Sequence, residues 1–155
     1  MVAKQIAKHF REVYFGGNWT SVNLKATLAE VTWQQSTTQV YQLNSIATLV
    51  YHIHYYVSAV LQVLQGGPLT ASDTYSFNHP PVEGPEDWNN LLQKVWSDAE
   101  NFAALLEQLP DDRLWLNFTN EKYGTYYRNM HGIVEHAHYH LGQIALIKKI
   151  LQQGV

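Results

Sequence analysis

The stretch HGIVEHAHYHLGQIALIKKI, residues 131–150, combines the apolar spacing of a buried helix with four of the chain's eight histidines. Its apolar residues recur at intervals of three and four, the period of a helix with one buried face. Ile133, Ile144 and Ile147 lie on that face. A helix of this kind is stable only when its apolar face packs against other elements, so its partners decide the fold.

Three further segments show the same helical spacing, and glycine or proline marks their ends. Asn44 or Ser45 can cap the second of these helices, and Pro85 is suited to the first position of the third. We therefore predict an all-α fold, a four-helix bundle. Its helices are expected near residues 2–16, 44–65, 85–109 and 126–153.

The sequence predicts the structure of the segments between these helices less clearly than that of the helices. Residues 18–43 allow a short helix capped by Asn23, but Thr and Gln are frequent after Trp33, so a connector with broken turns is also possible. Residues 66–84, GGPLTASDTYSFNHPPVEG, form a polar loop longer than most loops of compact domains. We interpret this loop as a crossover that wraps the surface between the second and third helices.

Length and composition narrow the function. The 155 residues, 46 % of them hydrophobic, predict one domain spanning residues 1–155. Without cysteine, any metal site must use His, Asp or Glu. The formal charge of −3, with scattered Lys and Arg, predicts no nucleic-acid or membrane partner. The N-terminus does not resemble a signal peptide and no run of 18 apolar residues occurs, so we expect a soluble, cytoplasmic protein.

The four histidines of the last helix fall on two sides. Positions four apart lie about 40° apart on a helix, and positions two apart lie about 200° apart. His136 and His140 therefore point inward with the buried isoleucines, whereas His131 and His138 point outward. Two inward imidazoles one turn apart can bind one metal ion, as in the zinc-protease H-E-x-x-H helix, although the protease glutamate is absent here. A pair of core histidines hydrogen-bonded to carbonyls or hydroxyls is the simpler alternative.

A metal site needs a third ligand from another helix. The segment VYHIHYYV offers His52 and His54. Both lie at the margins of the apolar face of the second helix, so the apolar periodicity does not decide between them. Their positions on a helical wheel slightly favour His52. His9 is expected on the surface of the first helix. His79 is expected to be a solvated residue of the long loop.

Three stretches together resemble the DinB/YfiT-like superfamily of bacterial four-helix-bundle metalloenzymes. They are SIATLVYHIHYYVSAVLQVLQGGPL, the helix that begins near PEDW, and GIVEHAHYHLGQIALIKK. The most specific features are a histidine early in the second helix and an H-x-x-x-H-x-G-Q run in the last, here His136, His140, Gly142 and Gln143. This match selects His52 as the third ligand, and His54 and His138 do not occupy ligand positions.

The resemblance implies a divalent ion, often zinc or nickel, bound by three histidines, and frequently a homodimer. The better-characterised relatives use low-molecular-weight thiols: transferases use bacillithiol, and an isomerase uses mycothiol. We therefore expect a metal-dependent S-transferase acting on a small-molecule substrate. There are three alternatives. The protein is a non-catalytic metal-binding bundle with a sensing, storage or stress-related role, a hydrolase that uses metal-activated water, or a structural bundle whose core histidines are hydrogen-bonded. Glu12, Tyr56 and Gln143 can approach the site, but the sequence assigns no catalytic residue.

Overall fold

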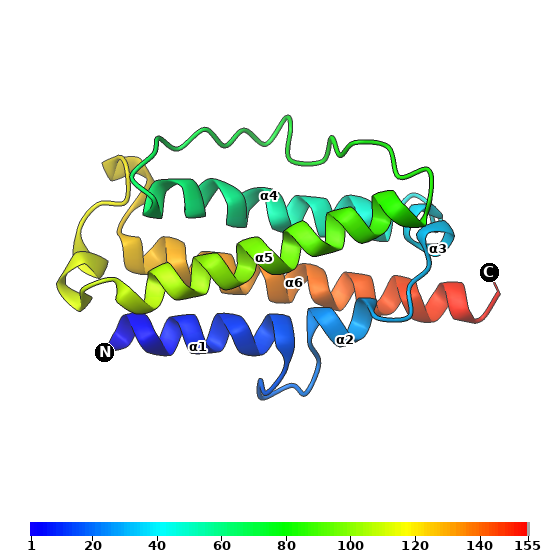
Figure 1. The fold of residues 1–155 in the computed structure, drawn as a ribbon, viewed down its shortest axis with the longest axis horizontal. Helices are drawn as coiled ribbons and strands as arrows, with labels where there is room; N and C mark the ends of the chain where they lie inside the picture. The colour runs from blue at the N-terminus through cyan, green and yellow to red at the C-terminus, as the bar shows by residue number, and fades with distance from the viewer. Residues whose placement is uncertain (155) are drawn as a thin grey trace.

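Four long helices run along the long axis of the molecule in the computed structural model, which describes residues 1–154 (Figure 1). They are α1 (Val2–Phe15), α4 (Ile46–Leu64), α5 (Pro85–Gln108) and α6 (Tyr126–Gln152). Their bounds agree with the predicted ranges to within two residues. Apart from one isolated bridge between Asn117 and Thr125, the described part of the chain has no β-structure, so the all-α prediction is confirmed.

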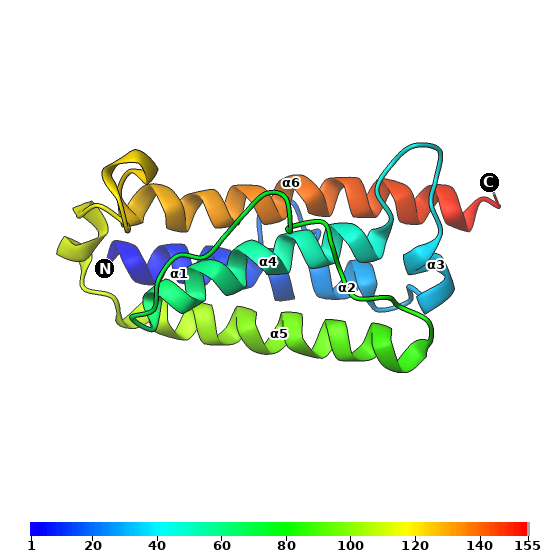
Figure 2. The same cartoon turned by 90° about the horizontal axis from the view of Figure 1, so that it is seen from above.

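The crossover sets the directions of the helices. Helices α4 and α5 run in the same direction, because residues 65–84 return along the whole length of the bundle between them (Figures 1 and 2). Helices α1 and α6 run the opposite way. Each of α1 and α4 contacts both α5 and α6, which gives the closed four-helix arrangement of a bundle. The predicted crossover is therefore confirmed.

Side-chain caps explain where two of the long helices begin. Ser45 precedes α4, and its hydroxyl oxygen accepts a hydrogen bond from the backbone N–H of Thr48. Thr125 precedes α6 and accepts in the same way from Arg128. Each cap satisfies a backbone donor that has no partner within its own helix, which fixes the position of the first turn. These two helices carry the candidate site.

Residues 18–43 hold two short helices, α2 (Leu24–Leu28) and α3 (Trp33–Thr37). Asn23 caps α2, as one of the two interpretations allowed. The connector interpretation is wrong for the part after Trp33, because Thr32 and Gln35 form a capping box that starts α3. Five residues are too few to show helical periodicity, so this helix was visible in the sequence only through the T-x-x-Q pattern of its cap.

The core between the helices is built on aromatic side chains. The rings of Phe10 on α1 and Phe102 on α5 are both fully buried, with centroids 4.6 Å apart. Tyr14 packs against Phe10 and places its ring edge against Trp96. Helix α4 is long and apolar enough to cross a membrane by length and composition, but 67 % of that window is buried within the bundle, where α4 forms part of the core.

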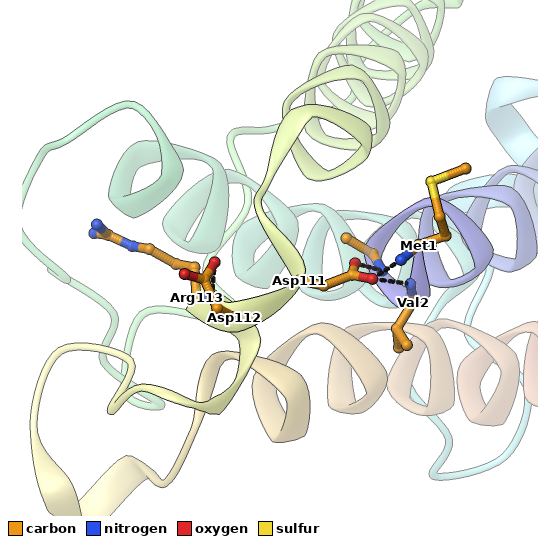
Figure 3. Close-up of polar contacts among 6 residues, drawn as sticks. Met1, Val2, Asp111, Asp112 and Arg113 are labelled. Atoms are coloured by element: carbon orange, nitrogen blue, oxygen red, sulfur yellow. Dashed lines mark hydrogen bonds and ion pairs between the residues drawn. The ribbon is translucent and has the colours of Figure 1, made fainter.

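One end of the bundle is closed by the segment between α5 and α6, which contains the 3₁₀ helices η1 (Asp111–Trp115) and η2 (Glu121–Tyr123). The carboxylate of Asp111 accepts hydrogen bonds from the backbone N–H groups of Val2 (2.8 Å) and Ala3 (3.0 Å) and contacts the amino nitrogen of Met1 (Figure 3). A carboxylate here satisfies free donors at the positive end of α1. This contact anchors the segment that forms one wall of the cavity described below.

Candidate metal centre

Three imidazoles meet where α4 faces α6. His52 comes from the second turn of α4, and His136 and His140 come from the middle of α6. One ring nitrogen of each lies within 4.8 Å of the others, and the Nε2 atoms of His52 and His136 are 3.0 Å apart. His52 and His140 are buried and His136 is half-buried. The structure thus brings together the three histidines that the sequence selected, and this group could hold a metal ion.

Hydrogen bonds to the other ring nitrogens fix two of the tautomers. The Oγ of Ser76 lies 3.0 Å from His52 Nδ1 and 2.9 Å from the carbonyl oxygen of Asp73. Because the serine hydroxyl donates to that carbonyl, we assign His52 Nδ1–H as the donor to Ser76. His140 Nδ1–H donates to Oε1 of Gln143, which can only accept, at 2.6 Å. Both imidazoles therefore keep the Nε2 lone pair free, as metal-binding histidines do.

Aromatic side chains enclose the ring of His52. Phe77 stacks on one face, with ring centroids 3.9 Å apart and an interplanar angle of 10°. The ring of Tyr56 presents its edge to His52 at 5.2 Å and lies 5.1 Å from His136. These contacts restrict rotation of the imidazole, so the direction of its free nitrogen is set before any ligand arrives.

The electrostatics of the group favour neutral imidazoles. Burial, together with the neighbouring His140 and His52, lowers the pKa of His136 to about 4. Burial is also the main cause that lowers the pKa of His52, with His140 adding to it and Ser76 opposing it. Both residues are therefore neutral at pH 7. A neutral imidazole is the form that binds a metal, so binding of an ion releases no net proton from these two residues.

The three histidines lie near the spacing that a divalent ion requires, with one ligand nitrogen of each within 4.8 Å of the others. Bonds of about 2.0–2.1 Å between zinc and histidine nitrogen place two such nitrogens at most about 4 Å apart. The Nε2 atoms of His52 and His136 lie within that limit at 3.0 Å. Without an ion, His136 would donate an Nε2 proton to His52. With an ion, that proton would be carried on Nδ1, and each of the three residues would have an unprotonated nitrogen with which to hold the ion.

His54 lies only two residues from His52 but faces α5. Its Nε2 lies 2.8 Å from Oδ2 of Asp98, and its side chain is 6 % exposed. Burial lowers the pKa of His54 more than Asp98 raises it, so the imidazole is neutral and donates Nε2–H to the carboxylate. His54 therefore has its polar partner on α5 and lies outside the group of three histidines.

The remaining histidines lie apart from the three. His9 is exposed on α1, as expected, and His138 is half-buried near Thr20. His131, which was expected to point outward, is half-buried against Tyr127 and lines the cavity described below. His79, which was expected to be a solvated loop residue, is half-buried and has a partner at each ring nitrogen. Its Nε2 lies 3.1 Å from the hydroxyl of Thr48, and its Nδ1–H donates to the carbonyl of Pro80 at 2.7 Å.

Of the three residues expected to approach the site, two do. Tyr56 flanks the imidazoles, and Gln143 holds His140 in place while its amide donates to the Tyr139 hydroxyl at 3.3 Å. Glu12 instead pairs with Lys8 on α1, at 3.7 Å. Sequence reasoning missed Ser76 and Phe77, because both belong to the irregular crossover, where no periodicity indicates which side chains turn inward.

A cavity of about 1210 Å³ opens beside the histidines. His52 and His136 line it, and His140 does not. Its walls come from α4, the crossover, the segment after η1, and the first turns of α6. About half of its lining residues are apolar or aromatic: Tyr56, Ala59, Val60, Leu69, Ala71, Phe77, Phe118, Tyr123, Tyr127 and Ile133. The charged lining residues are Asp73, Arg128 and Glu135. The volume is sufficient for a small-molecule ligand.

Comparison with known proteins identifies the family. The family model of the DinB superfamily matches residues 18–144, which include all three histidines and the crossover. No match was found among curated proteins or among solved structures. Since the matched region covers most of the 155 residues, this chain belongs to the DinB superfamily.

Proposed function

We propose that this protein is a metal-dependent enzyme that transfers a low-molecular-weight thiol to an electrophilic small molecule. His52, His136 and His140 hold one divalent ion, zinc or nickel. The observation that carries the proposal is the cavity of about 1210 Å³ bordered by His52 and His136. A storage or sensing protein needs to hold the ion but has no need of a substrate-sized space beside it.

An ion held at this position would supply Lewis-acid chemistry, lowering the pKa of a thiol or a water molecule beside it. Three neutral imidazoles leave its charge uncompensated, which favours the deprotonated form of a thiol in the cavity. In the transfer, the thiol loses its proton and the sulfur lone pair forms a bond to carbon. The bond between that carbon and the leaving group then breaks, and the leaving group keeps the electron pair.

The lining of the cavity indicates the kind of electrophile. Phe118, Tyr127 and Ile133 form an apolar wall on the side of α6, and Leu69 faces the cavity from the crossover. Arg128 is the one cationic Lys or Arg among the described lining residues. We therefore infer an electrophile with an apolar or aromatic body. The thiol is of the bacillithiol or mycothiol type, as in the characterised relatives.

The test is thiol consumption by the zinc-loaded protein with a chlorodinitrobenzene electrophile, measured above the uncatalysed rate. We expect turnover by the native chain and none by His140→Ala, whose residue lies outside the cavity lining. Leu69→Trp, which fills the cavity, should lower turnover while the zinc content stays unchanged. Ester hydrolysis without a thiol would instead support the hydrolase alternative. A zinc-loaded protein inactive with all thiols and esters would support a non-catalytic role.

We also propose a cytoplasmic homodimer without nucleic-acid or membrane partners. Tyr139 and Leu146 lie seven residues apart, and so on one face of α6, where they are 66 % and 57 % exposed. Large exposed apolar side chains of this kind commonly mark an interface. Sedimentation at micromolar concentration should detect a dimer that Leu146→Glu weakens, and a native chain that sediments only as a monomer would contradict the proposal.

A further inference from the structure

The crossover is attached to α4 beside the metal centre. Residues 65–84 contain no helix or strand, yet they follow the outer side of α4 closely (Figures 1 and 2). Between residues 72 and 79 they make four polar contacts with that helix. The contacts join Ser72 N to Tyr55 Oη (2.8 Å), Asp73 to Tyr56, Ser76 to His52 (3.0 Å), and His79 to Thr48 (3.1 Å).

Ser76 is the central contact. Its side chain is completely buried although it belongs to a polar loop. The hydroxyl accepts from His52 Nδ1–H and donates to the carbonyl of Asp73, so both of its hydrogen-bonding roles are used. An apolar residue at this position would leave the buried Nδ1–H of His52 without an acceptor, which would favour the tautomer that carries the proton on Nε2. That tautomer has no lone pair on Nε2, the nitrogen that faces His136 and the proposed ion.

Phe77, the next residue, fixes the plane of the same ring. Its stacking on His52 at 3.9 Å and 10° leaves the imidazole held at one face and at one nitrogen by adjacent residues of the crossover. The Tyr56–Asp73 hydrogen bond secures the turn that bears them. The backbone of this turn is itself bonded, with Ser76 N donating to Asp73 O at 3.2 Å and Tyr75 N donating to Ser72 O at 3.1 Å.

We propose that residues 72–79 of the crossover form an outer layer of the metal centre, in which Ser76 is a positioning residue that holds His52 ready for the ion. The inference rests on the proposed metal site. Energetic coupling between two events is reciprocal. If the Ser76 contact strengthens ion binding, ion binding strengthens the Ser76 contact by the same factor. The crossover therefore opens less often when the ion is bound, and the wall that it gives to the cavity is most stable in the loaded protein.

The first test compares Ser76→Ala with Thr74→Ala, a control in the same turn whose exposed side chain makes no hydrogen bond in the described residues. The dissociation constant for Zn²⁺ is measured by competition with a chelator. Loss of a hydrogen bond behind a ligating histidine commonly weakens binding by about 10–100-fold. We expect this change for Ser76→Ala and a change of less than about twofold for Thr74→Ala.

The second test needs no variant. Amide hydrogen exchange of the native chain is followed with and without Zn²⁺ at Ser72, Tyr75 and Ser76, with Ser21 and Val31 as hydrogen-bonded amides far along the chain. Zn²⁺ should slow exchange at Ser72, Tyr75 and Ser76 by a factor at least as large as the ratio of the Zn²⁺ dissociation constants of Ser76→Ala and the native chain. Exchange at Ser21 and Val31 should be unchanged. If Ser76→Ala does not fold, this measurement alone decides.

The outcomes separate the two proposals. A native chain that binds no Zn²⁺ overturns both the metal site and the crossover inference. A native chain that binds Zn²⁺, with Ser76→Ala of equal affinity, overturns the inference and leaves the site intact. If Zn²⁺ does not change the exchange rates at Ser72, Tyr75 and Ser76, the inference is likewise overturned and the metal site remains.

Discussion

Replacing Asp98 by alanine should destabilise the bundle without affecting the metal centre. Asp98 on α5 is the acceptor for the buried Nε2–H of His54, at 2.8 Å, and its side chain is 17 % exposed. Lys94 also contacts this carboxylate, at 3.3 Å, but the lysine side chain is 62 % exposed. The His54 contact is thus the shielded one, and its loss leaves a buried donor without a partner.

The expected loss of unfolding free energy follows from the difference in exposure between these two contacts. A hydrogen bond to a charged group contributes roughly 1.5–3 kcal/mol, and an unpaired buried donor costs about 1–3 kcal/mol. We therefore expect Asp98→Ala to lower the free energy of unfolding by about 1.5–3 kcal/mol. For a chain of this size each kcal/mol corresponds to roughly 2–4 °C in melting temperature. Lys94→Ala removes only an exposed ion pair and should cost less than about 1 kcal/mol.

Urea unfolding of the metal-free chain measures these values, with Asp98→Asn as a variant that keeps an acceptor and should lose less than Asp98→Ala. Zinc content after dialysis is measured in parallel and should be unchanged in all three variants. If Asp98→Ala cost no more than Lys94→Ala, the structural role of His54 would be refuted. If Asp98→Ala emptied the metal site, the choice of His52 over His54 would be refuted as well.

Two further predictions concern the histidines of α6. Gln143→Leu leaves His140 Nδ1–H without its acceptor and should weaken Zn²⁺ binding by about 10–100-fold in chelator competition, whereas Gln143→Glu keeps an acceptor and should bind more tightly than Gln143→Leu. Because the pKa of His136 is lowered to about 4 from its usual value near 6.5, the unfolded chain binds a proton between these pH values that the folded chain does not. The stability of the metal-free protein should therefore be full above pH 6.5 and fall toward pH 4, and the urea midpoint of His136→Gln should depend less steeply on pH in this window.

The long helices could be predicted from the sequence because their signals are redundant. In α5, for example, Pro85 marks the start, Pro110 follows the end, and the buried residues between recur with helical spacing. Helix α3 has only its cap as a signal. Short helices depend on tertiary packing more than on local pattern, so the sequence does not decide between a helix and a connector for residues 33–37.

The candidate site was predictable to different degrees. Helix geometry alone predicts that His136 and His140 share one side of α6, and in the structure the centroids of both rings lie 4.8 Å from that of His52. The choice between His52 and His54 depended on the family resemblance, since both side chains are buried and only their partners on other segments distinguish them. Those partners, Ser76 and Asp98, are distant in sequence, and no local pattern connects them to α4.

The most direct test of the central claim is the metal content of single-alanine variants after dialysis. The native chain, His54→Ala and His138→Ala should each retain one divalent ion per chain. His52→Ala, His136→Ala and His140→Ala should each retain none, because removal of any one of three protein ligands leaves too few for stable binding. A native chain without stoichiometric metal would contradict the account, and so would a His138→Ala variant that is empty while His136→Ala remains loaded.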